Sequence, residues 1–215
     1  MRIALIGGTG EEGMGLAYRF ALAGHQCIIG SRAIEKAQAA AAELREKDAS
    51  LQIEGAANER AAQNGDLIVV TTPYNAQAAT LPPLADALAN KIVISAVVPM
   101  AFNQGRASLI DVPEGSAAQQ AQALLARSTV VGAFQNLSAK KLLRDRPIEA
   151  DVVICADDAE AKRRIMDLAG DIAGVRGIDG GALANAKIVE AITVLLVSIN
   201  RAYKTQAGIR IAGVE

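Results

Sequence analysis

The first residues whose spacing suits chemistry are three glycines near the start of the chain. Gly8, Gly10 and Gly13 follow the pattern G-x-G-x-x-G, directly after the apolar run from Arg2 to Ile6 and before a segment of helical character. In a dinucleotide-binding turn the first glycine permits a tight bend, the second lets the backbone approach a pyrophosphate, and the third lets a helix pack against a strand. The start of that helix adds free N–H groups and a partial positive charge. The pattern therefore predicts a binding site for dinucleotide phosphates, with an ordinary flexible loop as the alternative.

A second group of residues, at the end of the next apolar run, indicates which dinucleotide binds. An NAD site would carry an acidic residue about 20 residues after the last glycine, where it holds the ribose 2′-hydroxyl. This chain instead has Ser31, Arg32 and, one helical turn later, Lys36. Two charge-assisted hydrogen bonds, each contributing about 1.5–3 kcal/mol, would favour NADP(H) over NAD(H) by about a hundredfold or more. The alternative is that Ser31 caps the next helix and the two cations are solvated.

Groups suited to general acid–base catalysis are scarce in the rest of the sequence. The single histidine, His25, lies at the wrong end of a predicted strand, and the three tyrosines show no Tyr-x-x-x-Lys spacing. Asp157 and Asp158 are better explained as a helix cap than as a catalytic pair. Lys187 and Asn185 remain candidates on the last predicted helix. Hydride transfer between two redox coenzymes needs stacked rings at the right distance and little proton chemistry, so the scarcity favours that reaction.

Composition sets the kind of protein that positions these residues. The 215 residues suit one domain, or a nucleotide-binding domain with a modest addition. Apolar residues make up 51% of the chain but aromatic residues only 3%, which is typical of a buried parallel sheet covered by Ala-rich helices. The net charge of −1 gives no overall basic field for nucleic acid or for an anionic membrane.

Cysteine usage and hydropathy indicate the compartment. Cys27 and Cys155 lie inside predicted strands and are expected to be buried thiols, and no His/Cys cluster has the spacing of a metal site. The chain enters a strand at once, without a basic-then-apolar leader. Its longest apolar segment, from Ile188 to Ile199, is interrupted by Glu190 and is shorter than a membrane span. We therefore expect a soluble, cytoplasmic protein.

Strands and helices are predicted to alternate along the chain, which favours right-handed crossovers and a parallel sheet. After the first strand, strands are predicted at 26–30, 51–55, 66–71, 91–95, 129–134, 151–156 and 175–179, and helices at 16–23, 33–47, 59–64, 82–89, 116–127, 139–144, after 158, and at 183–205. The predicted fold is a Rossmann-type, doubly wound α/β sheet, mostly parallel, with a small C-terminal helical portion that binds the substrate. Residues 1–137 would be the NADP-binding domain. Residues 138–215 would extend the sheet and add a long helix and tail that form the acceptor site and a dimer interface.

Ligands of such sheets lie beyond the carboxyl ends of the strands, where the strand order reverses. That edge corresponds to residues 7–13, 71–74 and 95–100. The passage 99–115 is predicted to be a long loop, which raises the expectation of a binding loop or lid.

Two features of the C-terminal part remain open to more than one interpretation. The last helix is apolar around nearly its whole circumference, which suggests burial on several sides, including against a second subunit. The tail at 208–211 could be a strand or a flap. A basic run is formed by Lys140, Lys141, Arg144 and Arg146. Such a run is usually solvated, although it could also meet an anionic substrate.

The whole chain resembles a family of NADPH-dependent reductases of coenzyme F420, a deazaflavin. The resemblance is carried by Gly7-Gly8-Thr9-Gly10-x-x-Gly13-x-Gly15, Gly30-Ser31-Arg32-x-x-x-Lys36, Val97-Val98-Pro99, Ala133-Phe134-x-Asn136-Leu137-Ser138-Ala139, Leu183-x-Asn185-Ala186-x-x-Val189-Glu190, Ile199-Asn200-Arg201-x-Tyr203-Lys204 and Ala207-Gly208-Ile209. It runs from the first residue almost to the last and is specific at both ends.

The resemblance implies reversible hydride transfer between NADP(H) and the deazaflavin, in a dimeric cytoplasmic enzyme without a required acid–base residue. It implies a cofactor site of Thr9, Gly10, Glu11, Glu12, Ser31, Arg32, Lys36, Val98 and Ala139, and a substrate site of Gln135, Leu137, Thr193 and Gly208, with Leu137 packed near the nicotinamide. Gln135 stands where family members often carry a histidine, and Glu11-Glu12 is unusually acidic for a phosphate turn. The alternatives are an NADPH-dependent reductase of a flavin, quinone or imine on the same scaffold, and a non-enzymatic NADP(H)-sensing protein.

Overall fold

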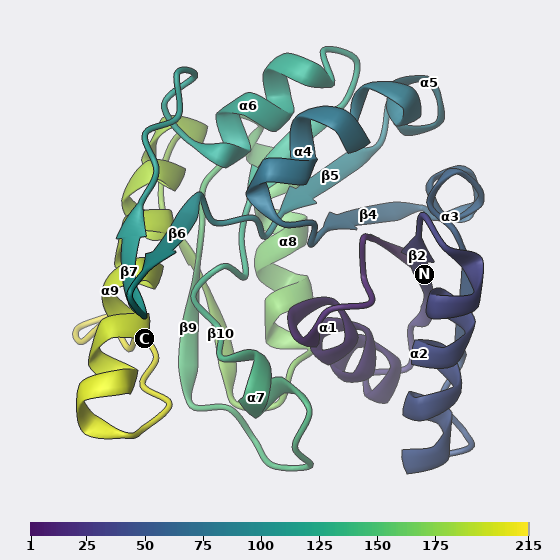
Figure 1. The fold of residues 1–215 in the computed structure, drawn as a ribbon, viewed down its shortest axis with the longest axis horizontal. Coiled ribbons are helices and arrows are strands. Elements are labelled where there is room, and N and C mark those ends of the chain that lie inside the picture. Colours follow the sequence, from purple (N-terminus) through teal and green to yellow (C-terminus); the bar gives the residue numbers. More distant parts are fainter. Residues whose placement is uncertain (215) are drawn as a thin grey trace.

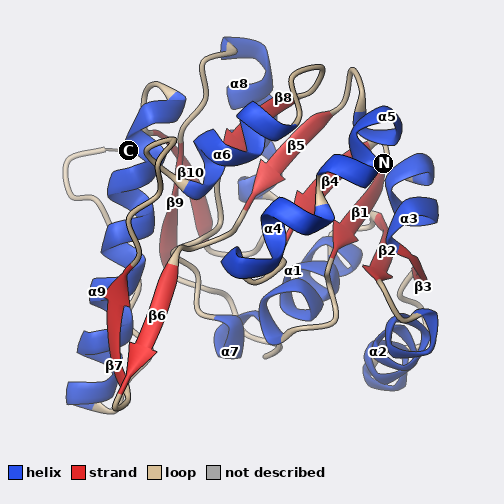
Figure 2. Cartoon of the chain, turned by 45° about the horizontal axis from the view of Figure 1, so that its top comes forward, coloured by secondary structure: helices blue, strands red, loops and turns tan. Residues whose placement is uncertain are grey.

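The computed structural model describes residues 1–214, and its centre is a sheet of six parallel strands (Figure 2). The strands lie in the order β3-β2-β1-β4-β5-β8, so the order reverses between β1 and β4. Their bounds are β1 Arg2–Ile6, β2 Gln26–Ser31, β3 Ile53–Ala57, β4 Leu67–Val70, β5 Ile92–Ser95 and β8 Thr129–Gly132. This is the doubly wound Rossmann arrangement, and it confirms the predicted fold class.

Helices cover both faces of the sheet because successive residues of each strand point to opposite sides. In β1, Ile3 and Leu5 belong to one apolar cluster, whereas Ala4 and Ile6 belong to the other. The first cluster includes residues of α1 Glu11–Leu22, α2 Ile34–Lys47 and α8 Ala159–Gly170, and the second includes residues of α3 Asn58–Asn64, α5 Ala85–Leu88 and α6 Ala117–Leu124. Figure 1 shows α1 and α2 on one side of the sheet and α5 and α6 on the other.

Most predicted elements exist, with ends that differ by a few residues. The predicted helix at 82–89 is a 3-10 turn, Pro82–Leu84, followed by the short α5. A further helix, α4 Tyr74–Thr80, was not among the predicted helices. Pro73 in fact occupies the residue before the helix, where its fixed φ and missing N–H do no harm.

The C-terminal strands form a separate pair rather than further strands of the main sheet. β9 Ala150–Ile154 and β10 Val175–Asp179 are parallel to each other. An antiparallel bridge between Gly132 and Cys155, with both N–H···O distances 2.9 Å, joins this pair to the end of β8. α8 connects the two strands, and the Asp158 side chain caps it by accepting a hydrogen bond from the N–H of Ala161 at 2.7 Å, as predicted. The predicted domain boundary at residue 137 stays a prediction.

The passage predicted as a long loop contains a β-hairpin, so that prediction was wrong. β6 Met100–Asn103 and β7 Arg106–Leu109 pair antiparallel, and the turn residues Gln104 and Gly105 have positive φ angles of 46° and 75°. The hairpin lies along α9 Ala186–Tyr203 (Figure 1). The Arg201 guanidinium donates to the carbonyl of Gly105. Both strands are short and largely exposed, so the sequence lacks the alternation of apolar and polar residues that would have shown them.

The tail at residues 208–211 lies against β9 without forming a strand. The carbonyl of Ile209 accepts from the N–H of Asp151 at 2.8 Å, and the N–H of Ile211 donates to the Asp151 carboxylate at 2.6 Å. Arg176 donates to both carboxylate oxygens of Asp151 at 2.8 Å and to tail carbonyls, including that of Ile211 at 3.1 Å. Asp151 is fully buried and its charge is paired, so it ties the tail to the strand.

The last helical segment carries an exposed apolar stripe. Ile188 and Leu195 are 59% and 57% exposed, and the partly exposed Ile192 and Ile199 lie on the same face at helical spacing. The most apolar 18 residues of the helical span Leu183–Tyr203 have a mean hydropathy of 1.5, and among residues 1–214 this span is long and apolar enough to cross a membrane by length and composition. The shorter apolar segment taken from the sequence was therefore an underestimate. The core helix of a soluble protein can be equally long and apolar, and 33% of those 18 residues are buried in this structure.

Candidate functional site at the carboxyl ends of the strands

The glycine turn has the open geometry that a phosphate site requires. The N–H of Gly8 donates to the carbonyl of Gly30 at 2.9 Å, which ties the turn to the end of β2. A Cβ added at Gly13 would lie 2.5 Å from the Cα of Gly8, so only glycine lets α1 start this close to the turn. A Cβ at Gly10 would meet no atom within 4 Å, so the space in front of the turn is free for a ligand.

Asn58 supports this turn, and sequence reasoning missed it. Its Oδ1 accepts a hydrogen bond from the N–H of Gly7 at 3.1 Å, and the residue is 8% exposed. Gly7 has a φ of 69°, so the bend depends on glycine there as well. Asn58 begins α3, far along the chain, and no local signal in the sequence connects it to residue 7.

The first turn of α1 holds two glutamates with different surroundings. Gly10 is the residue before the helix and makes no side-chain cap, so α1 presents its first backbone N–H groups without a side-chain partner. Glu11 is exposed. Glu12 lines a cavity of about 700 Å³, and within residues 1–214 its buried Oε1 has no hydrogen-bond partner. Burial raises the pKa of Glu12 to about 8, so the group keeps its proton at neutral pH.

The residues predicted to select NADP(H) lie together at the end of β2. Ser31 is 8% exposed and its Oγ accepts from the N–H of Ala33 at 3.2 Å. Arg32 and Lys36 are exposed, and neither makes a salt bridge among the residues that the structure describes. Two unpaired cations beside the free edge of the glycine turn suit an additional phosphate.

A cavity of about 700 Å³, called the main cavity below, opens beyond β1, β4, β5 and β8. Six residues predicted from the sequence line it, namely Glu12, Val98, Gln135, Leu137, Ala139 and Thr193. Thr9, Gly10, Glu11, Ser31, Arg32, Lys36 and Gly208 do not line it. The carboxyl ends of the strands meet here because β4 pairs with both β1 and β5 in register, Ile6 beside Val70 and Val70 beside Ser95.

Gln135 is the most conspicuous polar group of the main cavity. It is 4% exposed, and neither its Oε1 nor its Nε2 has a hydrogen-bond partner within residues 1–214. Its carbonyl accepts from the Thr193 hydroxyl at 3.1 Å, which fixes the backbone of residue 135 to α9. A buried amide without hydrogen-bond partners lowers the stability of the folded protein. Gln135 is therefore available to a ligand that offers both a donor and an acceptor.

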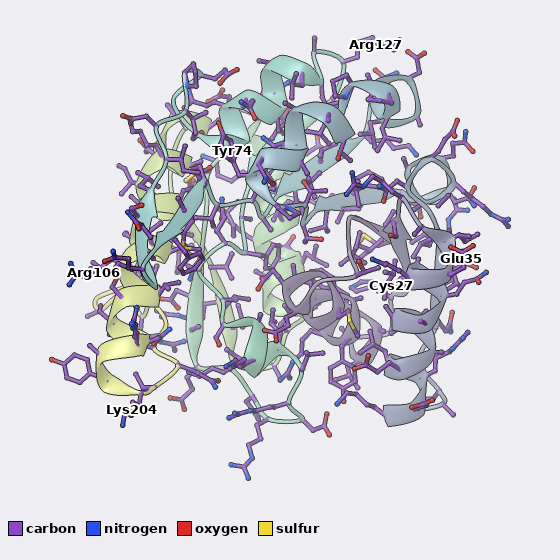
Figure 3. All side chains as sticks on the ribbon, in the orientation of Figure 1. Cys27, Glu35, Tyr74, Arg106, Arg127 and Lys204 are labelled. Atoms are coloured by element: carbon purple, nitrogen blue, oxygen red, sulfur yellow. The ribbon has the colours of Figure 1, made fainter. Side chains whose placement is uncertain are left out.

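The main cavity also contains residues outside the predicted cofactor and substrate sites. Tyr74, labelled in Figure 3, begins α4. Met100 comes from the hairpin, and both residues lie in the ranges 71–74 and 95–100 that were expected at the ligand edge. On the other side the wall is formed by Lys140, Asn200, Arg201 and residues 204–207. Ala207 lines the cavity, whereas its neighbour Gly208, which was expected in the substrate site, does not. These residues come from distant parts of the chain and meet only in the folded protein.

α7 Ala139–Leu142 is held directly against the helix that starts at the glycine turn. An added Cβ at Gly15 would lie 2.6 Å from the Cβ of Leu142, so the two helices touch where a side chain is missing. The Arg19 guanidinium, 5% exposed, donates to the carbonyls of Lys141 at 3.0 Å and Leu142 at 2.7 Å. The helix that starts at the glycine turn, α1, and the helix beside the main cavity, α7, are therefore packed together as one unit.

The cavity shows neither a thiol nor a metal cluster as a source of chemistry. Burial raises the pKa of Cys27 to about 12 and that of Cys155 to about 11, and both thiols are free. Within residues 1–214, no group of three or more His, Cys, Asp or Glu side chains could hold a metal ion. The arrangement can bind a phosphorylated dinucleotide beside an apolar cavity large enough for a second ring system.

Comparison with known proteins agrees with this geometry. Residues 2–99 match the family described as "NADP oxidoreductase coenzyme F420-dependent". A protein of Methanocaldococcus jannaschii named F420-dependent NADP reductase is 42% identical over 223 residues, which cover 100% of both chains. A protein of the same name from Methanothermobacter thermautotrophicus is 43% identical over 98% of this chain and 94% of its own.

Solved structures show the same fold over the whole chain. A crystal structure from Arthrobacter sp. FB24, described provisionally as an F420-dependent NADP-reductase, has a TM-score of 0.85 and 26% identity and covers 99% of both chains. An imine reductase from Bacillus cereus has a TM-score of 0.64 and 16% identity, and covers 94% of this chain and 63% of its own. The second likeness concerns the fold alone.

Proposed function

The chain belongs to the family of F420-dependent NADP reductases, and we propose on this basis that it transfers a hydride between NADP(H) and coenzyme F420, a deazaflavin. The single observation that carries the proposal is the similarity over the full length of the chain, and the open glycine turn and the cavity beside it agree with it. The enzyme is an oxidoreductase with NADP(H) and F420 as its two coenzymes.

The residues present fit the first of these coenzymes. The free space at Gly10 and the unpartnered N–H groups of α1 suit a pyrophosphate, and the unpaired Arg32 and Lys36 suit a 2′-phosphate. Val98, Leu137 and Ala139 would border the nicotinamide and keep water from it. When bound, NADP(H) supplies or receives the hydride.

The acceptor side fits a flat ring with polar edges. The Gln135 amide is buried with both of its polar atoms unpaired, and a ring that offers a neighbouring donor and acceptor would satisfy them. Thr193 fixes the carbonyl of Gln135, so we assign it a positioning role on the acceptor side. Gly208 does not line the main cavity, and a Cβ added to it would lie 3.5 Å from the Cβ of Ala150. It would therefore act through its neighbour Ala207, which lines the cavity. Orientation of two rings then provides most of the catalysis.

The proposed reaction is tested by mixing the purified protein with NADPH and oxidised F420. We expect loss of the visible absorbance of the deazaflavin in step with oxidation of NADPH. The matched control replaces the acceptor with free flavin, a quinone or an imine at equal concentration. Oxidation of NADPH with one of these acceptors and none with F420 would contradict the assignment of the acceptor.

We further propose that the enzyme is a cytoplasmic homodimer. The apolar stripe of α9, formed by Ile188, Ile192, Leu195 and Ile199, is the surface that a second copy would cover. Two free, buried cysteines are typical of a reducing compartment.

A further inference from the structure

Phe134 has a backbone conformation that its residue type rarely adopts. Its φ angle is 70°, in the left-handed region that glycine and asparagine favour, and the residue is fully buried. The other non-glycine residues of 1–214 with a positive φ are all exposed, namely Asn90, Gln104 and Lys204. A bulky side chain in this region costs free energy, and it persists only where the surrounding structure imposes the conformation. Glycine would adopt this φ without strain, so the contacts of the Phe134 ring must offset a cost that glycine would not have.

The strained residue is the point at which the chain turns from β8 into the main cavity. Just before Phe134, the N–H of Ala133 donates to the carbonyl of Ser95 at the end of β5, at 3.2 Å. Beyond it, residues 135–139, called the cavity loop below, all line the main cavity. The N–H of Leu137 donates to the carbonyl of Phe134 at 3.2 Å and closes the turn. The direction in which the cavity loop leaves the sheet therefore depends on the φ angle of Phe134.

Hydrogen bonds hold the cavity loop to the C-terminal part of the chain. The Thr193 hydroxyl of α9 donates to the carbonyl of Gln135 at 3.1 Å. The side chain of Asn136, which is 2% exposed, donates from Nδ2 to the carbonyl of Asp151 in β9 at 2.6 Å. These contacts fix the loop relative to α9 and β9, which form the acceptor side of the site.

The ring of Phe134 supplies a contact to the coenzyme side. It packs edge-to-face on Phe20 of α1, with the ring centroids 5.6 Å apart and an interplanar angle of 85°. Phe20 is also fully buried, and both rings belong to the first apolar cluster. An aromatic pair of this geometry is stabilised by more than the burial of its surface. Because α1 starts at the glycine turn, the Phe20–Phe134 pair joins the helix assigned to the pyrophosphate with the loop that lines the cavity.

We propose that Phe134 is a positioning residue for hydride transfer: its ring, packed against Phe20, keeps the cavity loop at a fixed distance from the glycine turn and so sets the separation of the two coenzyme rings. The proposal rests on the function proposed above and goes beyond it. Phe134 does not line the main cavity, so it acts only through residues 135–139. A displacement of about 1 Å can lower a reaction rate by about a hundredfold, so a loosened loop should slow the transfer more than it weakens binding.

The test compares Phe134→Gly with Leu44→Ala. Glycine accepts the positive φ without strain, so the first variant removes the ring and leaves the backbone conformation available. Leu44 is a fully buried residue of the same apolar cluster, in α2, so Leu44→Ala also opens a cavity in the core and lowers stability. The rate of hydride transfer from NADPH to F420 in a single turnover should fall about ten- to hundredfold in Phe134→Gly and less than about twofold in Leu44→Ala. The Kd of NADPH should stay within about twofold of wild type in both, because the glycine turn is unchanged.

Hydrogen exchange of the free protein provides a measurement that does not depend on the reaction. The N–H of Leu137 is bonded to the carbonyl of Phe134, so its exchange reports opening of the turn. This exchange should be at least about tenfold faster in Phe134→Gly than in Leu44→Ala. The N–H groups of β1, in the centre of the sheet, should exchange at similar rates in the two variants.

Two further variants complete the design. Phe134→Leu fills most of the space with an apolar side chain and should restore the transfer rate to within about threefold of wild type. If Phe134→Gly does not fold, Phe20→Leu weakens the same contact from α1. It should slow the transfer and accelerate exchange at Leu137, each by about two- to fivefold.

The outcomes separate the two proposals. Wild-type protein that does not reduce F420 would contradict the proposed function, and hydrogen exchange would still decide the role of Phe134. Equal transfer rates in Phe134→Gly and Leu44→Ala, or equal exchange at Leu137 in these variants, would overturn the positioning role alone. Phe134 would then be an ordinary residue of the core.

Discussion

Arg32 and Lys36 are the side chains through which the protein would distinguish NADP(H) from NAD(H). Both are exposed and without a salt-bridge partner in the described chain, so neither has a structural contact to lose. We expect Arg32→Ala and Lys36→Ala each to raise the KM for NADPH about tenfold and to leave the use of NADH nearly unchanged. Steady-state kinetics with both coenzymes measures this.

Arg45→Ala is the matched control, because Arg45 is an exposed cation on the same helix, away from the glycine turn. It should leave both coenzymes unaffected. Equal losses with NADPH and NADH in the Arg32 and Lys36 variants would mean that these side chains do not recognise the 2′-phosphate.

Glu12 should make coenzyme binding depend on pH. Burial raises the pKa of Glu12 to about 8, so below that pH the carboxyl is neutral and does not repel the pyrophosphate. As the pH rises through about 8 the carboxylate forms, and the KM for NADPH should rise several-fold. Glu12→Gln should abolish this rise, and Glu11→Gln, which removes an exposed carboxylate one residue away, should not.

The same shift predicts how Glu12 affects stability. The folded protein holds the proton up to about pH 8, whereas in the unfolded chain the group releases it near its ordinary value of 4.5. Between these values the folded state binds more protons, so the free energy of unfolding should fall as the pH rises. Denaturant titration at several pH values checks this, and a flatter profile for Glu12→Gln is the expected result. An unchanged profile would show that the carboxyl is ionised in the folded protein.

Residue types and short spacings predicted the phosphate end of the site but only part of the acceptor end. The glycine turn and Ser31-Arg32 are local patterns, and the structure places them at the ends of β1 and β2, while their roles in binding stay predictions. Asn58 and Lys204 were not assigned to the site, because each reaches it by a tertiary approach that no spacing in the sequence records. The orphaned amide of Gln135 likewise becomes evident only when its surroundings are known.

At the scale of elements, Glu190 joins α9 to α6, a contact that no pattern in the sequence predicts. It is 1% exposed, and its carboxylate accepts hydrogen bonds from the N–H groups of Ala117 and Ala118 at 2.9 and 3.1 Å, at the start of α6. Burial raises its pKa to about 7, against the effect of these two donors. The contact fixes α9, and hence Thr193, relative to the main sheet.

Removing this carboxylate should destabilise the protein. Glu190→Ala leaves two buried N–H groups without an acceptor, and we expect the free energy of unfolding to fall by about 1–3 kcal/mol. Glu190→Gln keeps one acceptor oxygen and should lose less. Lys187→Ala, an exposed change on the same helix, serves as the control and should stay within about 0.5 kcal/mol of wild type. If Glu190→Ala unfolds at the same denaturant concentration as that control, the two hydrogen bonds do not stabilise the fold.

The strands that were predicted from the sequence and those that were missed differ in how many of their side chains are buried. Strands such as β1 and β4 are apolar along their length because both faces of the sheet are covered, and such runs are easy to detect. The hairpin of β6 and β7 has mostly exposed side chains, so its composition resembles that of a loop. The separate pairing of β9 with β10 depends on register and on the bridge at Gly132, neither of which is visible in a single sequence.

At the scale of the whole molecule, the proposed dimer would cover the apolar stripe of α9. Leu195→Glu places a charge at the centre of that stripe, next to Ile192 and Ile199, and should convert the dimer into a monomer in sedimentation experiments. Lys187→Glu changes an exposed position of the same helix and should leave the dimer intact. A wild-type protein that sediments as a monomer would contradict the assembly and leave the stripe exposed in solution.

Gly15 shows how closely the halves of the molecule depend on each other. In most helices an alanine in place of glycine adds about 1 kcal/mol of stability, because glycine leaves the unfolded backbone too much freedom. In Gly15→Ala the added methyl group would clash with Leu142 and push α7 away from α1. The substitution should therefore lower the free energy of unfolding instead of raising it. Because α7 also carries Ala139, which we propose borders the nicotinamide, Gly15→Ala should slow hydride transfer as well as destabilise the fold.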